Sequence, residues 1–244
     1  MSRFRSNLNT AATIVRQYNG AEPFASMVKK FFSAHKKYGS RDRKQISHLC
    51  YCYFRTGKMF FAASASTLET NIITAFFLCT TERNEILSAI APELEAFTAL
   101  PSDEKISLLR QRALIPAGDL PELIFPWESF LSEGMEFRHF ALSFFIQPDL
   151  FIRIRPGYRE KVMKVLKASG ISYYTLGNDG IGLPNHTKAD EMFDINKEAV
   201  VQDYSSQRVE ELLHPLQQQQ QLQVWDCCAA SGGKSILVKD FLGD

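Results

Sequence analysis

The sequence has no long apolar run and few cysteines. It contains no stretch of 18 consecutive apolar residues, so we expect no transmembrane helix. The N-terminal MSRFRSNLNTAATIVRQ lacks the apolar segment and cleavage site of a signal peptide. Five cysteines without disulfide or zinc spacing, and five scattered histidines, predict a reducing, cytoplasmic compartment and no metal. We therefore expect neither a membrane nor a metal as partner.

The net charge of +1 conceals an asymmetry along the chain. The first sixty residues carry twelve Lys and Arg against two acids, Glu22 and Asp42, whereas the rest carries sixteen against twenty-five. A basic block predicts a polyanionic partner, most simply RNA. The alternative is a solvated helical surface that binds nothing, and charge alone does not separate the two.

Residues 1–145 have the periodicity of helices. In QISHLCYCYF, apolar residues recur at the spacing of one helical face, and NIITAFFLC is apolar nearly all round, as in a buried helix. Basic residues flank the first of these segments at both ends. They are candidate RNA contacts: Arg41, Arg43, Lys44, Arg55 and Lys58.

Residues 146–200 predict a small α+β domain. LFIRIR alternates as a strand, with Phe151, Arg153 and Arg155 on one side and Ile152 and Ile154 on the other. GYREKVMKVLKASG predicts a helix, and ISYYTL and GNDGIGL predict two further strands. Arg153 and Arg155 are further candidate RNA contacts.

Residues 201–244 predict the beginning of another α/β domain. VVQDYSSQRVEELL gives an extended lead-in and a helix, LQVWDCC a buried strand, and SGGKSILVKDFL a glycine turn that opens a helix. Strand, loop and helix in this order form the entry of a doubly wound, Rossmann-like sheet. The predicted fold class is therefore mixed: an all-α domain, a small α+β domain, and the first strand and helix of a Rossmann-like domain.

The stretch VWDCCAASGGKS ends like a phosphate-binding P-loop, GxxxxGK[ST]. Cys228 stands where that motif needs its first glycine, and Asp226 would repel a triphosphate. A carboxylate there suits a cationic ligand such as S-adenosylmethionine, while the helix N-terminus suits the carboxylate of that ligand. A nucleotide triphosphate and a turn without ligand remain alternatives. The candidate cofactor-binding residues are Asp226, Cys228, Ala229, Ala230, Ser231, Gly232, Gly233 and Lys234.

This stretch resembles the DxCAAPGGK[ST] motif of the Sun/Fmu-type RNA cytosine-5 methyltransferases. Ser231 is the departure, since the family usually has proline there. VQDYSSQ is similar to the segment that precedes the loop in the family, with matches at Gln202, Asp203, Ser206 and Gln207. FIRIRP resembles the start of the family's RRM-like domain, and SRDRKQISHLCYCYFRTGK resembles the NusB-like RNA-binding domain of some members.

The resemblance implies methyl transfer from S-adenosylmethionine to a cytosine of RNA, most simply ribosomal RNA. In this family one cysteine thiolate attacks C6 of cytosine and a second assists release, both within proline-cysteine or threonine-cysteine motifs. None of the five cysteines here fits either motif, so we expect the catalytic residues beyond Asp244 and no activity from the 244 residues alone. The alternatives are a non-catalytic RNA-binding module and a degenerate P-loop nucleotide hydrolase.

Overall fold

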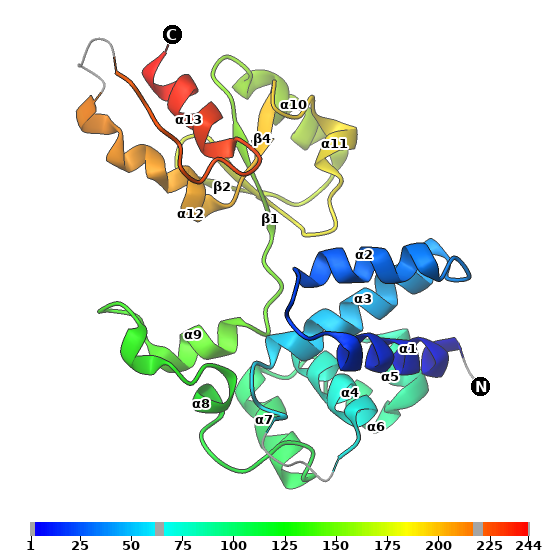
Figure 1. Ribbon diagram of the computed structural model, residues 1–244. Coiled ribbons are helices and arrows are strands. Elements are labelled where there is room, and N and C mark those ends of the chain that lie inside the picture. The colour runs from blue at the N-terminus through cyan, green and yellow to red at the C-terminus, as the bar shows by residue number, and fades with distance from the viewer. Residues whose placement is uncertain (1–2, 62–65, 217–221, 244) are drawn as a thin grey trace. The chain divides into compact units, whose positions relative to one another are not determined.

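The computed structural model describes residues 3–61, 66–216 and 222–243. The chain forms two compact units, Met1–Gln147 and Pro148–Asp244 (Figure 1). Helices and one small antiparallel sheet make up the described residues, which confirms the mixed fold class. Residues 148–200 and 201–244, which the sequence assigns to two domains, lie within one compact unit. No helix in the described ranges is long and apolar enough to span a membrane.

The described elements of the first unit are all helical. The expected amphipathic and buried helices are both present, as α3 and α4 respectively. The elements are α1 (Arg3–Gln17), α2 (Phe24–Ala34), α3 (Ser40–Arg55), α4 (Leu68–Cys79), α5 (Glu85–Ile90), α6 (Pro92–Glu95), α7 (Ser102–Gln111), α8 (Leu120–Ile124), the short 3-10 helix η1 (Glu128–Phe130) and α9 (Phe137–Ser143).

The core of the first unit forms around α4, which is buried on nearly every side. Thr67 caps its N-terminus by accepting a hydrogen bond from the Thr70 N–H. At the other end, the buried ammonium group of Lys105 donates to the carbonyl oxygens of Thr80 (2.5 Å) and Phe77 (3.4 Å). A cation is favourable at a helix C-terminus, although burial lowers the pKa of Lys105. This contact ties α7 to α4.

The second unit is built on a four-stranded antiparallel sheet in the order β2-β3-β1-β4. Along the chain the elements alternate strand, helix, two strands, helix and strand before the final helices. They are β1 (Leu150–Ile154), α10 (Arg159–Ser169), β2 (Tyr174–Leu176), β3 (Gly180–Leu183), α11 (Ala189–Met192), β4 (Ala199–Val201), α12 (Tyr204–Gln207), the 3-10 helices η2 (Arg208–Leu212) and η3 (His214–Leu216), and α13 (Gly233–Leu242).

The alternation predicted for β1 sorts its side chains between the two faces of the sheet. Ile152 and Ile154 are buried in a core with Val162 and Leu166 of α10. Arg153 is buried on the opposite face, where α12 and α13 lie side by side (Figure 1). Both faces of the central strand are therefore covered.

The buried strand predicted over LQVWDCC is wrong. Residues 222–226 have no regular secondary structure, and Val224 and Trp225 are 55% and 88% exposed. A strand needs a neighbour to satisfy its backbone N–H and C=O groups, and no described strand pairs with this segment. The helix that follows is present as α13.

Candidate functional site

The loop expected from the sequence to bind the cofactor, residues 226–234, is folded around the carboxylate of Asp226. One oxygen of this carboxylate accepts a hydrogen bond from the Cys228 N–H (3.0 Å), and the other accepts from the Ser235 hydroxyl (2.6 Å). The Ser235 hydroxyl, followed by the Cys228 N–H, holds the pKa of Asp226 below its ordinary value. The loop therefore carries a permanent negative charge near neutral pH.

The loop turns into α13 at Gly232, whose φ of +82° is the left-handed conformation that favours glycine. The Gly232 N–H donates to the Ala229 carbonyl oxygen (2.5 Å) and closes the turn. Cys228, Ala229, Ala230 and Ser231 are exposed. The amides at the start of α13 and Asp226 are the groups expected from the sequence to contact the carboxylate and the cationic group of the ligand.

The structure brings the second motif, VQDYSSQ, against this loop. Gln202 is buried. Its main-chain carbonyl oxygen accepts a hydrogen bond from the side-chain amide of Gln207 (2.8 Å), and its side-chain amide donates to the main-chain carbonyl oxygen of Ser206 (3.3 Å). A Cβ placed on Gly233 would lie 3.6 Å from the Gln202 side chain. The two sequence motifs therefore form one packed junction between β4, α12 and α13.

Arg153 and Arg155 lie together with Asp240, an acidic residue that we did not single out from the sequence. Asp240 accepts from Arg153 Nη1 (2.8 Å) and Arg155 Nη2 (2.5 Å), and its side chain is only 7% exposed. Burial raises the pKa of Asp240, but the hydrogen bonds from both arginines outweigh burial and lower it. One signal in the sequence was available: a lone carboxylate in the apolar segment SILVKDFL.

This ion-pair cluster changes our interpretation of both arginines. Arg153 is 4% exposed, so its role as a surface contact for RNA phosphate is corrected to an internal ion pair with Asp240. Arg155 is more exposed but is held by the same carboxylate and by the Asn196 carbonyl oxygen (2.7 Å). Both guanidinium groups therefore form ion pairs within the second unit.

The basic residues predicted on α3 divide into exposed and packed groups. Lys44 is exposed, and Arg41 is exposed while pairing with Glu85 (2.7 Å). Arg43 donates to the Tyr38 carbonyl oxygen (2.8 Å) and lies over the Phe32 ring. Two of these residues, Arg41 and Lys44, therefore present their side chains to solvent at the first turn of the helix.

At the other end of α3, the basic side chains pack against the protein. Arg55 Nη1 is buried without a hydrogen-bond partner among the described residues, and the guanidinium contributes to lowering the pKa of Cys79, after the hydrogen bond from Cys52. Lys58 is exposed, and its ammonium lies 4.6 Å from the centre of the Trp127 ring. Lys58 is therefore the more exposed of the two.

Additional cations lie close to Arg41 and Lys44 in the sequence, on α2 and on the connection to α3. Residues 22–44, which span α2, the connection to α3 and its first turn, contain seven Lys and Arg and two acids. Lys29, Lys36 and Lys37 are exposed, and neither Lys29 nor Lys36 forms an ion pair with a described residue. The sequence signal for them was the charge density of the first sixty residues. We call Lys29, Lys36, Lys37, Arg41 and Lys44 the basic edge.

The cysteines do not form a catalytic pair in the described structure. Burial raises the pKa of Cys50 to about 12, and the hydrogen bond that the Cys52 thiol donates to Cys79 raises the pKa of Cys52. Cys227 and Cys228 are exposed with their sulfurs 4.0 Å apart, and the contact with Cys227 raises the pKa of Cys228. A reactive thiol needs a lowered pKa and access, and the pKa is raised at Cys50, Cys52 and Cys228.

In the described ranges, no group of three His, Cys, Asp or Glu side chains is arranged to hold a metal ion.

Comparison with protein-family models finds none that matches the chain, and neither curated proteins nor solved structures give a match. Function must therefore be inferred from the residues themselves.

Proposed function

We propose that the protein belongs to the S-adenosylmethionine-dependent RNA cytosine-5 methyltransferases, with the cofactor at residues 226–234 and RNA at the basic edge. The observation that carries the proposal is the junction of the two motifs, in which Gly233 of the loop packs on Gln202 of VQDYSSQ. Two short motifs separated in sequence are weak signals singly. Their packing against one another supports a shared role.

The finer domain assignments belong to the same proposal. The element order β1–α10–β2–β3–α11–β4, with sheet order β2-β3-β1-β4, is that of a split β-α-β unit, which supports an RRM-like domain. RRM domains bind bases on an open sheet face. Here one face packs on α10 and the other lies under α12 and α13, so the basic edge of the NusB-like unit would carry most phosphate contacts.

We expect the chain to bind single-stranded RNA with an affinity that falls steeply with salt. Each phosphate contact from a lysine releases counterions and contributes about 0.7 to the slope of log affinity against log salt. Replacing Lys36→Gln and Lys44→Gln together should lower the slope by about 1 to 2 and weaken binding at low salt. Fluorescence anisotropy of a labelled oligonucleotide at several salt concentrations measures both quantities.

The matched control is the double substitution Lys164→Gln and Lys167→Gln, which removes two exposed charges of α10 in the second unit. It should leave the slope nearly unchanged. Equal losses in the two double variants would place the RNA elsewhere, and a salt-independent affinity would contradict phosphate contacts altogether.

The cofactor loop gives a separate prediction. The 244-residue chain should bind S-adenosylmethionine with a dissociation constant no tighter than about 1 mM and transfer no methyl group. The reason is that the loop is exposed and Asp226 is already hydrogen-bonded within it. Isothermal titration with S-adenosylmethionine, and with Mg-ATP as the comparison ligand, measures the binding. Micromolar affinity for Mg-ATP would favour a nucleotide hydrolase, and robust methylation of RNA would refute the prediction.

A non-catalytic RNA-binding module is the second candidate. The exposure of Val224 and Trp225 just before the loop favours it, because a cofactor site in a Rossmann-like sheet requires a paired strand at that position. The two candidates share the RNA surface and differ in the cofactor. Salt-dependent RNA binding by a longer form of the protein that does not bind S-adenosylmethionine would favour the non-catalytic RNA-binding module.

A further inference from the structure

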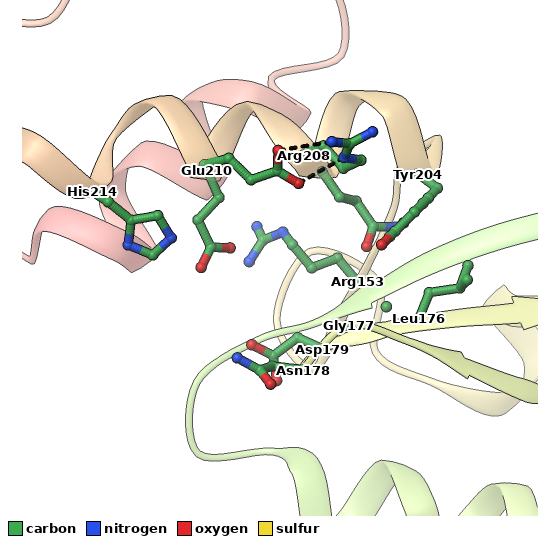
Figure 2. A pocket seen from close by; sticks show the side chains of 12 residues that line it. Arg153, Leu176, Gly177, Asn178, Asp179, Tyr204, Arg208, Glu210 and His214 are labelled. Carbon is green, nitrogen blue, oxygen red and sulfur yellow. Dashed lines mark hydrogen bonds and ion pairs between the residues drawn. The ribbon is translucent and has the colours of Figure 1, made fainter. Parts of the chain in front are cut away.

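A small pocket opens in the second unit beside Arg153. Its volume is about 170 Å³, and its walls are the turn between β2 and β3 and the stretch from Tyr204 to His214 (Figure 2). Drug-sized ligands occupy pockets of about 300 Å³ or more. This pocket has the room of about five or six water molecules, which suits one planar ring system.

Arg153 supplies the pocket with an unused hydrogen-bond donor. Its Nε donates to Gln202 Oε1 (3.1 Å) and its Nη1 to Asp240 (2.8 Å), but its buried Nη2 has no partner among the described residues. Figure 2 shows the guanidinium directed into the space between Glu210 and Asp179. Buried donors are nearly always paired in folded proteins, so an orphan at a pocket wall marks a place for an acceptor.

The charges of the lining disfavour inorganic phosphate as the ligand. Arg153 shares the Asp240 carboxylate with Arg155, and Arg208 forms a two-point ion pair with Glu211 (2.6 and 2.9 Å). Asp179 lies 3.7 Å from Arg159, and Glu210 forms no ion pair with a described residue. A phosphate would therefore meet the carboxylates of the lining, where each arginine already pairs with a carboxylate. The lining suits a neutral group that accepts from Arg153 and donates to a carboxylate.

The geometry points to a guanine base as the occupant. Guanine carries the acceptors O6 and N7, which arginine reads, next to the two donors N1–H and N2–H, which match the two oxygens of one carboxylate. Adenine and cytosine have a single amino donor on the corresponding edge. Figure 2 shows the Glu210 carboxylate and the Arg153 guanidinium pointing toward one another, and Tyr204 also lines the pocket. The ligand is an unpaired guanosine nucleotide of RNA, so this inference rests on the proposed RNA binding.

The test uses the full chain and free mononucleotides, so that it does not depend on the basic edge. We expect guanosine 5′-monophosphate to shift the amide resonances of Gly177 and Gly180 saturably, with an affinity about tenfold or more above that of adenosine 5′-monophosphate. Inorganic phosphate should cause no such shifts. Glu210→Gln should weaken guanosine monophosphate about tenfold, whereas Asp190→Asn, an exposed carboxylate of α11, should not.

Four results would overturn the assignment: no saturable shifts, equal affinity for the two nucleotides, the same shifts with phosphate alone, or unchanged affinity in Glu210→Gln. The amide spectrum of each variant shows whether it is folded. If guanosine monophosphate fails while RNA binds with a steep salt dependence, the pocket assignment falls and the proposed function stands. If it binds while RNA does not, the RNA proposal is the one that fails.

Discussion

Replacing Asp240 by alanine is expected to destabilise the second unit by about 3–5 kcal/mol. The carboxylate lies between two arginines, and both Arg153 and Asp240 are nearly removed from solvent, with side chains 5% and 7% exposed. The substitution leaves the charge of Arg153 buried without its partner, which costs far more than the ion pair itself contributes. Hydrogen exchange at the amides of β1 and β4 measures the loss directly.

The matched control is Glu211→Gln, which removes a carboxylate from the exposed ion pair with Arg208 in the same unit. Such surface pairs contribute little, so exchange should be unchanged. Asp240→Asn gives a pH test: the folded pKa of Asp240 is lowered, so its stabilisation is present above the unfolded pKa of about 3.9 and is lost as pH falls through the folded pKa. The asparagine variant should lack this acid-dependent component. Equal hydrogen exchange in the unsubstituted chain, in Asp240→Ala and in Asp240→Asn would show that the ion pairs of Asp240 do not stabilise the second unit.

Local patterns in the sequence predicted much of the fold. The helical spacing of Ile46, Leu49 and Cys50 places all three on the buried side of α3, in the core of the first unit. The alternation in LFIRIR places Ile152 and Ile154 in the core under α10. These predictions succeed because the period of each element decides which side chains it can bury together. The same alternation assigned Arg153 and Arg155 to one face correctly.

Local sequence patterns did not predict which residues cover that face of the sheet. Asp240 lies 87 residues from Arg153 in sequence, and only the packing of α13 on the sheet makes it their partner. A charged side chain on a strand face is expected to contact solvent unless another element covers that face. The strand predicted over residues 222–228 failed for a related reason: an apolar run becomes a strand only where another strand pairs with it. The turn that carries Asp226 depends on short-range contacts such as the hydrogen bond from the Cys228 N–H to Asp226, which the sequence analysis did not predict.

Replacing Gly57 by alanine is expected to destabilise the first unit by about 2–5 kcal/mol, from strain in the left-handed conformation and from overpacking. Gly57 follows α3 with a φ of +58°, and a Cβ there would lie 1.9 Å from the carbonyl oxygen of Ile124. The next residue is held in place, since the Lys58 N–H donates to the Leu123 carbonyl oxygen (3.0 Å). The backbone of α8 therefore cannot retreat without breaking a hydrogen bond. Urea unfolding followed by far-UV circular dichroism measures the change.

Gly20→Ala separates the two causes of this loss. Gly20 also has a positive φ, +78°, but no atom lies within 4 Å of a Cβ placed on it. Its substitution carries only the conformational strain, about 1–2 kcal/mol. A loss at Gly57 no larger than that at Gly20 would mean that α8 shifts freely away from the end of α3. Lys58 and its contact with Trp127 would then move with it, and this end of α3 would not hold a fixed charge at the surface.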